Sequence, residues 1–212
     1  MEAQQIHLTD RFSSAIDYAR HLHIERRKGT GIPYMAHLLG VASLVMGEAG
    51  FAAVPVTEDM VIAALLHDAV EDHGGATRLE DIRQNFGPEV ARMVEGLSDT
   101  LAENPHQKEP WETRKEAYLL RLRSERPDVQ LISAADKLYN ARTMLDDHRE
   151  IGHQVWGRFK RGRDEQIRYF NALLAIFRES GTNRIVNELD RVVAELTRVS
   201  ANDPKETGSP SS

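Results

Sequence analysis

Hydrophobic residues recur every three or four positions along most of the chain, which is the spacing of one face of an α-helix. The first stretch predicts a helix from Thr9–Asp10 to about Arg27, with apolar positions at Phe12, Ala15, Ile16, Ala19 and Leu22. Pro33 suits the first turn of a second helix, which Gly50 ends. Further helices are predicted from Ile167 to Phe177 and from Arg184 to Val199, and no strand-like alternation of useful length occurs.

A third predicted helix, from Thr57 to Asp72, is apolar all round before it becomes polar at its end. Thr57 is the expected N-cap, and the apolar run from Val61 to Leu66 indicates burial on every side. Four polar residues then follow within six positions: His67, Asp68, Glu71 and Asp72. Bare carboxylates are costly both in a buried place and at the negative end of a helix dipole, so a divalent metal ion would resolve the conflict. A helix end whose acidic groups simply face water is the alternative, which the adjoining apolar run disfavours.

The remaining segments add one more helix with polar groups beside its apolar face. A capping box at Thr77–Glu80 predicts the start of a short helix, and Pro88 to about Leu97 predicts an amphipathic one. Residues Ser98 to Pro110 are polar and irregular. Pro127–Asp128 opens a helix with an apolar stripe of Leu131, Ala135 and Leu138 and an adjacent polar stripe of Asp136, Asn140 and Thr143. Asp136 is therefore a carboxylate at the margin of a core face.

The 212 residues are enough for one sizeable domain, and no linker or internal repeat divides them. We therefore predict an all-α fold with one domain over residues 8–199 and a disordered C-terminal tail over 200–212. The formal net charge of −6 argues against nucleic acid as a partner, and no apolar run reaches the length of a membrane span. The absence of cysteine excludes disulfides and thiolate zinc sites. With no signal-peptide pattern, the expected location is the cytoplasm.

Four inward-facing polar residues form the candidate metal site: His37, His67, Asp68 and Asp136. On its own, an inward histidine such as His37 is more often a satisfied core residue than a ligand. Together, two imidazoles and two carboxylates suit manganese, iron or another borderline to hard divalent ion, and the lack of sulfur weakens the case for structural zinc. Glu71 and Asp72 lie one turn beyond, within reach of a proton on a water that such an ion activates.

These residues resemble the metal set of the HD-domain phosphohydrolases. The fuller motifs are Arg27-Lys28 before Pro33-Tyr34-Met35-Ala36-His37, then His67-Asp68-Ala69-Val70-Glu71-Asp72, then Ala135-Asp136-Lys137-Leu138-Tyr139-Asn140-Ala141-Arg142. Over about residues 8 to 180 they are similar to the hydrolase half of RelA/SpoT-type alarmone enzymes, and most similar to the small single-domain alarmone hydrolases. The resemblance implies a single helical bundle of the HD-domain type and a bound Mn²⁺ ion, with other divalent ions left open. It also implies removal of the 3′-pyrophosphate from guanosine tetra- or pentaphosphate (ppGpp or pppGpp).

The same resemblance implies roles for individual residues. Glu71 and Asp72 match the family's catalytic acids. Arg27 and Lys28 match its loop that contacts phosphate and base, and Asn140 matches a residue at the nucleotide ribose. Weaker matches around the phosphates are Lys108, Arg114, Lys115 and Tyr169. Two departures bear on substrate choice: the loop before Pro33 is one residue longer than in the long bifunctional enzymes, and His73 stands where those enzymes usually have threonine.

Two other functions stay open at this point. One is a phosphatase that acts on another nucleotide, such as the 2′-phosphate of NADPH. The other is a catalytically silent sensor that binds metal and nucleotide, which the presence of both Glu71 and Asp72 disfavours. In each case the partner is a small nucleotide rather than nucleic acid or a membrane, and a homo-oligomer is compatible with the sequence.

Overall fold

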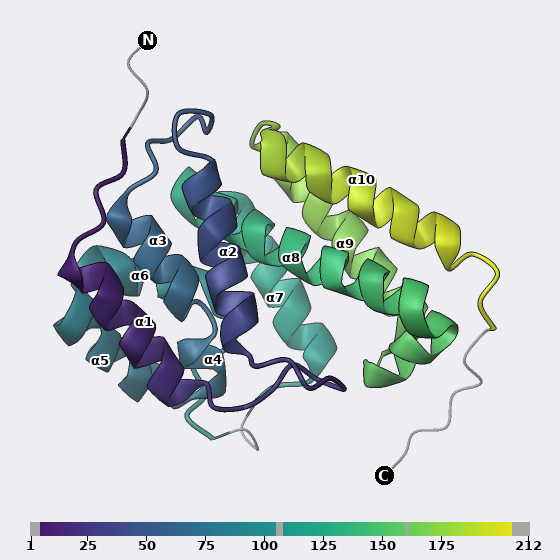
Figure 1. Cartoon of the computed structure of the whole chain (residues 1–212), viewed down its shortest axis with the longest axis horizontal. Coiled ribbons are helices and arrows are strands. Elements are labelled where there is room, and N and C mark those ends of the chain that lie inside the picture. The colour runs from purple at the N-terminus through teal and green to yellow at the C-terminus, as the bar shows by residue number, and fades with distance from the viewer. Residues whose placement is uncertain (1–4, 105–107, 160, 205–212) are drawn as a thin grey trace.

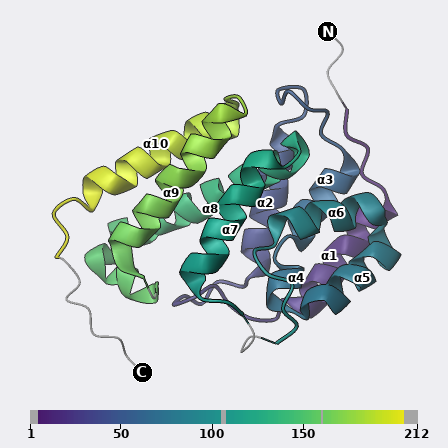
Figure 2. The same cartoon turned by 180° about the vertical axis from the view of Figure 1, so that it is seen from behind.

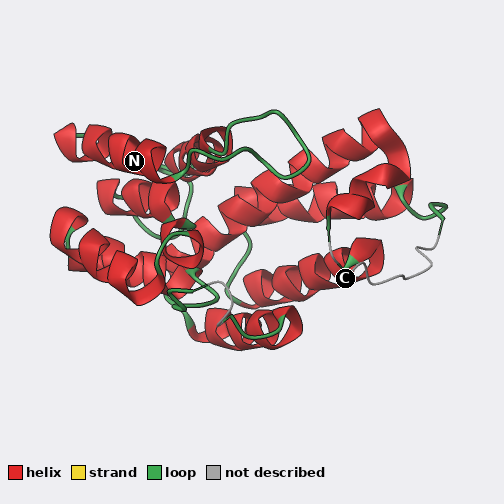
Figure 3. Cartoon of the chain, turned by 90° about the horizontal axis from the view of Figure 1, so that it is seen from below, coloured by secondary structure: helices red, strands yellow, loops and turns green. Residues whose placement is uncertain are grey.

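The structure is a computed structural model that describes residues 5–104, 108–159 and 161–204. Within these ranges every regular element is a helix, as predicted (Figures 1 and 3). The elements are α1 (Asp10–Leu22), α2 (Met35–Gly47), α3 (Glu58–Leu66), α4 (Ala69–Asp72), α5 (Gly75–Phe86), α6 (Pro88–Leu97), α7 (Trp111–Ser124), α8 (Pro127–Ile151), the 3₁₀ helix η2 (Gly152–Arg158), α9 (Gly162–Glu179) and α10 (Arg184–Val199). None of the described helices is long and apolar enough to cross a membrane.

The long helix α8 holds the bundle together. It packs against α2, α3 and α6 on one side and against α10 on the other, while α7 packs on α9. Figures 1 and 2 show α1 to α6 at one end of the bundle and α9 with α10 at the other, with α7 and α8 between them. Every part of the chain that carries a predicted ligand therefore lies on α8 or in the group that packs against its first side.

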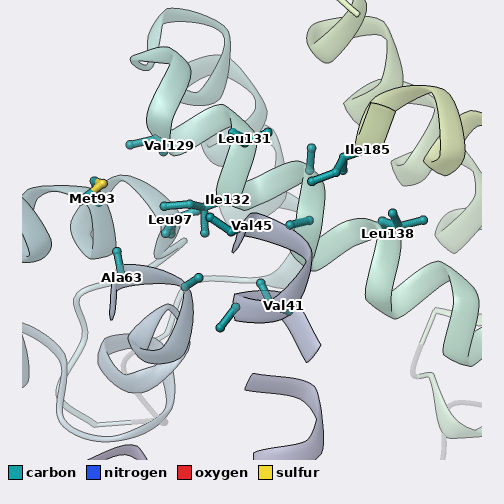
Figure 4. Packing of buried hydrophobic residues seen from close by; sticks show 14 of the residues in the cluster. Val41, Val45, Ala63, Met93, Leu97, Val129, Leu131, Ile132, Leu138 and Ile185 are labelled. Carbon is teal, nitrogen blue, oxygen red and sulfur yellow. The ribbon is translucent and has the colours of Figure 1, made fainter. Parts of the chain in front are cut away.

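The core is continuous from α2 and α3 through α6 to α8. Val45 of α2, Leu97 of α6 and Ile132 of α8 meet in its centre, and all three are buried (Figure 4). In α3 each residue from Met60 to Leu66 is buried, which explains why this helix is apolar on every side. Its N-cap is Thr57, whose hydroxyl accepts a hydrogen bond from the Met60 amide at 3.3 Å.

Helices α2 and α8 approach each other closely at Gly40. A β-carbon at this position would lie 2.1 Å from Cε2 of Tyr139, so only glycine allows this packing. Gly40 lies one turn after His37, and Tyr139 lies one turn after Asp136. The close approach therefore brings the His37 imidazole and the Asp136 carboxylate to the same point.

The prediction of one helix from Thr57 to Asp72 is wrong at its end. Helix α3 stops at Leu66, and the short helix α4 begins after His67 and Asp68. The His67 ring explains part of the break, because its Nδ1–H donates to the carbonyl of Ala64 at 2.8 Å. Asp68 has φ −93° and ψ −8°, which tilts the following turn away from the axis of α3.

The limits of α1 and α5 also differ from the prediction. Helix α1 ends at Leu22 rather than near Arg27, because the chain folds back and pairs the Tyr34 amide with the Glu25 carbonyl at 3.0 Å. The predicted capping box at Thr77–Glu80 is not used, since α5 begins at Gly75. Gly75 has φ +53°, and a β-carbon there would meet the Leu101 carbonyl at 2.3 Å.

Helices α6 and α10 have the predicted limits, and Pro127 opens α8. Helix α9 is longer than predicted, because it begins at Gly162 rather than Ile167 and ends at Glu179 rather than Phe177, and α2 ends at Gly47 rather than Gly50. Of the tail predicted over 200–212, residues 205–212 lie outside the described residues.

Candidate metal centre and active site

The four predicted ligands converge at the middle of the molecule. His37 comes from α2, His67 and Asp68 from the turn between α3 and α4, and Asp136 from α8. The Nε2 atoms of His37 and His67 lie 3.2 Å apart. Asp68 Oδ2 lies 3.4 Å and 3.1 Å from these two nitrogens, and Asp136 Oδ1 lies 3.4 Å and 3.6 Å from them. Residues from three distant parts of the sequence thus present two nitrogens and two oxygens to one point.

The orientation of the His67 ring leaves its Nε2 free to act as a ligand. A backbone carbonyl can only accept, so the contact with Ala64 places the proton on Nδ1 and the lone pair of a neutral ring on Nε2. The His37 ring has a buried Nδ1 without a partner among the described residues, and its Nε2 also faces the centre. Burial lowers the pKa of His37 below its ordinary value, which keeps this imidazole neutral and able to bind a cation.

The charged groups at this point depend on one another. Burial alone would raise the pKa of Asp68, but the neighbouring His67 and His37 hold it well below its usual range. Burial would likewise lower the pKa of His67, while Asp68 and Asp136 raise it well above the usual value. Without a metal, the structure therefore favours a proton at His67 to balance the buried carboxylate of Asp136 and the partly exposed carboxylate of Asp68.

The donor set fits a divalent metal ion. One ligand atom each from His37, His67 and Asp136 lies within 4.8 Å of the other two, and Asp68 Oδ2 adds a fourth donor. Mixed imidazole and carboxylate ligands suit divalent ions of the first transition row, and no thiolate is present to bias the site toward structural zinc. One cation at the common point would satisfy all four donors and replace the proton that the metal-free cluster needs.

Three neighbours orient the carboxylate ligands. The Tyr34 hydroxyl donates to Asp68 Oδ2 at 2.6 Å, and Asn140 Nδ2 donates to Asp136 Oδ1 at 2.6 Å. The Lys137 ammonium pairs with the other oxygen of Asp136. Such contacts fix the direction of metal ligands and commonly matter almost as much as the ligands themselves. Sequence reasoning gave no role to Tyr34 or Lys137, although both stand inside the quoted motifs.

The two candidate catalytic acids lie on α4, at the edge of the centre. Glu71 lines a cavity of about 160 Å³ together with all four candidate ligands, whereas Asp72 is not among its lining residues. Burial raises the pKa of Glu71 above its usual value. Burial, with the nearby charges of Asp68 and Glu71, raises the pKa of Asp72 to about 7. Both carboxyl groups therefore favour holding a proton more than an exposed acid does.

The central cavity continues into a second cavity of about 370 Å³. Six residues line both: Arg27, Tyr34, Lys115, Lys137, Asn140 and Tyr169. Lys28 and Arg158 add positive charge to the outer cavity, and Trp111, Phe159 and Phe170 add aromatic surface. The inner cavity is lined by groups of both charges, whereas the outer cavity is basic and more apolar.

The structure separates the predicted substrate-binding residues into two groups. Arg27, Lys28, Lys115, Asn140 and Tyr169 line these cavities. Arg27 also donates to Asn140 Oδ1 at 2.6 Å, which links the loop before α2 to α8. Lys108 and Arg114 are not among the lining residues and face acidic groups instead.

Acidic partners hold the second group in place. Lys108 Nζ lies 3.9 Å from Asp72 Oδ1, and Arg114 Nη1 lies 3.5 Å from Glu71 Oε1. Arg114 and Lys115 both pair with Asp99, a buried carboxylate that sequence reasoning missed because it stands in an irregular segment.

Comparisons with known proteins identify the family of this chain. A model of the HD domain family matches residues 15–159. The guanosine-3′,5′-bis(diphosphate) 3′-pyrophosphohydrolase MESH1 of Mus musculus is 33% identical over 182 residues, which cover 79% of this chain and 93% of the relative. An enzyme named guanosine-3′,5′-bis(diphosphate) 3′-pyrophosphohydrolase from Aquifex aeolicus is 35% identical over 130 residues, which cover 61% of this chain and 17% of the relative.

Two solved structures share the fold. One, described as a metazoan ortholog of SpoT that hydrolyses ppGpp, aligns with a TM-score of 0.67 and 27% identity over 91% of this chain and 96% of that chain. A crystal structure from Listeria monocytogenes EGD-e aligns with a TM-score of 0.61 and 32% identity over 79% of this chain and 99% of that chain. The chain therefore belongs to the HD-domain family and is a metal-dependent phosphohydrolase of the group that includes the MESH1 enzymes.

Proposed function

We propose that this protein uses Mn²⁺ to hydrolyse guanosine tetra- and pentaphosphate at the 3′-pyrophosphate. One observation carries the proposal: the four-donor centre shares its cavity with Glu71, and this cavity opens directly into a basic and aromatic one. A nucleotide fits this arrangement if its charged 3′ group lies at the four-donor centre and the rest of the molecule lies in the basic and aromatic cavity. The names of the relatives point to the same reaction.

We assign His37, His67, Asp68 and Asp136 to the metal. Bound among these side chains, Mn²⁺ would supply Lewis acidity toward a phosphoryl oxygen and toward the attacking water. The contacts described above then give three residues the role of orienting the two carboxylates toward the metal: Tyr34, Asn140 and Lys137.

Glu71 is the acid that lines the cavity, so we assign to it the contact with the attacking water. Its raised pKa makes it a better proton acceptor than an exposed carboxylate, which suits a group that takes a proton from the attacking water. Asp72 is 39% exposed and lies beside Lys108, so it can exchange that proton with solvent. In this scheme water attacks the 3′ phosphorus, the bond to the ribose 3′ oxygen breaks, and a proton returns to that oxygen. The products are pyrophosphate and a guanosine 5′-di- or triphosphate.

The basic residues of the two cavities bind the substrate in this proposal. We assign Arg27 and Lys115, which line both cavities, to the 3′ phosphates, and Lys28 and Arg158, which line the outer cavity, to the 5′ phosphates. Tyr169 and Trp111 have ring centroids 5.9 Å apart and provide aromatic surface for a purine. A concentration of positive charge within an acidic protein is what a highly charged nucleotide requires.

The test is a substrate panel in the presence of Mn²⁺, with products separated by anion-exchange chromatography. The proposal predicts that guanosine tetraphosphate gives guanosine diphosphate and pyrophosphate in equal amounts. Mg²⁺ in place of Mn²⁺ tests the choice of metal, and NADPH tests the competing phosphatase activity. Release of orthophosphate from NADPH with no cleavage of either guanosine nucleotide would contradict the proposal.

A further inference from the structure

A second group of ligand-type side chains lies beside the metal centre and has no role in the proposed reaction. It consists of His23 at the end of α1, Glu25 in the following loop and His73 directly after α4. We call it the His23 cluster. One donor atom from each of the three residues lies within 4.8 Å of the other two.

The His23 cluster has the local geometry of the first centre. His23 Nδ1 and His73 Nε2 lie 3.2 Å apart, which is also the separation of the two Nε2 atoms of His37 and His67. Glu25 Oε1 lies 2.8 Å from His23 Nδ1 and 3.6 Å from His73 Nε2. In the described structure, the metal centre and the His23 cluster therefore both contain two imidazole nitrogens that face each other and a carboxylate oxygen close to them.

Protons alone leave this geometry incompletely paired. If His23 Nδ1 carries a proton, it can donate to Glu25, and the nearby His73 nitrogen then competes for the same hydrogen. If His73 Nε2 carries the proton instead, it can donate to His23 Nδ1 at 3.2 Å, but Glu25 Oε1 then faces the lone pair of that nitrogen at 2.8 Å. A cation between the three atoms interacts with all of them at once. In either case the buried Nε2 of His23 has no partner among the described residues. A hydrogen bond from Nε2 therefore does not explain the position of this ring.

We propose that His23, Glu25 and His73 form a second divalent-cation site that prefers zinc-class ions. Two imidazoles and one glutamate are a common set of three protein ligands for Zn²⁺ with an open fourth position. The nitrogen content of the set favours Zn²⁺ over Mn²⁺ and excludes a preference for Mg²⁺. Access is available from solvent, because the His73 and Glu25 side chains are 27% and 39% exposed.

The His23 cluster is in contact with the first centre through one aromatic ring. His23 stacks on Tyr34, with ring centroids 5.0 Å apart and planes 9° from parallel, and the Tyr34 hydroxyl donates to Asp68. Glu25 also begins the loop that carries Arg27 and Lys28. A cation here would fasten this loop to the end of α4, next to the catalytic acids.

The test is metal stoichiometry on the full chain by equilibrium dialysis against buffered Zn²⁺, with the metal measured by mass spectrometry. We expect two ions per chain in the wild type, one in His73→Asn and one in His67→Ala. His153→Asn is the matched control, since His153 is an exposed histidine outside both clusters, and it should retain two ions. One ion in the wild type, or two in His73→Asn, would overturn the proposal.

A second variant covers the case in which His73→Asn fails to fold. Glu25→Gln keeps the size of the side chain and removes the charged ligand, and it should weaken binding of the second ion by at least tenfold. Unchanged affinity for the second ion in a folded Glu25→Gln protein would overturn the proposal independently. Mg²⁺ in the same dialysis should leave the His23 cluster empty, and its binding there at micromolar concentration would contradict the assigned ion class.

Discussion

The metal centre and the His23 cluster share a pair of histidine nitrogens 3.2 Å apart, yet their surroundings differ. At the metal centre both histidines are buried, two carboxylates join them, and Tyr34, Asn140 and Lys137 hold these carboxylates. The His23 cluster has one carboxylate, and two of its three side chains are partly exposed. We therefore expect the first site, whose ligands come from three elements of the core, to hold its ion firmly. We expect the second site, at a loop and a helix end, to exchange its ion with solvent more readily.

The largest difference between the two regions is expected when one histidine is removed from each. His67→Ala should reduce hydrolysis of guanosine tetraphosphate to background, because the first centre loses a ligand and with it the ion. His73→Asn should keep the ion at the first centre. Metal content and turnover measured on the same preparations check both expectations. Normal turnover by folded His67→Ala would mean that the reaction does not use this centre.

The carboxylates next to each region should also behave differently. Glu71→Gln and Asp72→Asn should lower kcat by roughly two to four orders of magnitude through loss of proton transfer, with metal retained at the first centre. Glu25→Gln should instead lose only the ion of the His23 cluster. Rapid-quench kinetics with metal analysis distinguishes these results. Loss of the first-centre ion from the Glu71→Gln protein would place Glu71 among the ligands.

Stability should depend on pH through Asp72. Its folded pKa of about 7 exceeds the unfolded value of about 3.9, so the folded state binds the extra proton. The stability from this proton is complete below about pH 4 and is lost as the pH rises to about 7.

Asp72→Asn should therefore raise the free energy of unfolding of metal-free protein by about 1–2 kcal/mol at pH 8 and hardly at all at pH 4. The effect at pH 8 is smaller than the full pKa shift implies, because solvent screens the charge of a partly exposed side chain. Urea unfolding at both pH values measures it. Equal effects at the two pH values would show that the carboxyl group titrates normally.

The smallest effect is expected in the loop that joins the two regions. Lys28 lines the outer cavity, and Lys28→Gln should raise KM about fivefold, the effect of roughly 1 kcal/mol for one screened charge pair. The effect should shrink at high salt, and kcat should not change. Arg191→Gln on α10 is the control for the loss of a charge elsewhere. Salt-independent KM in Lys28→Gln would remove Lys28 from the substrate site.

Hydrophobic spacing predicted most helices because each buries one face, and it predicted α6 and α10 with their limits. It missed the break after Leu66, because the hydrogen bond from His67 to the Ala64 carbonyl and the backbone angles of Asp68 do not change the spacing of hydrophobic residues. The four candidate ligands could be chosen because each is polar at an inward position. Asp99 and the His23 cluster could not, because they lie in loops or at helix ends where polar residues are ordinary.

The most direct test of the central assignment is anomalous diffraction from crystals of the wild-type protein grown with Mn²⁺. We predict one strong manganese peak within about 2.0–2.4 Å of ligand atoms from His37, His67, Asp68 and Asp136, a range typical of nitrogen and oxygen ligands. We also predict a weaker peak, or none, at the His23 cluster. A manganese peak only at His23, Glu25 and His73, with none at His37, His67, Asp68 and Asp136, would contradict this assignment.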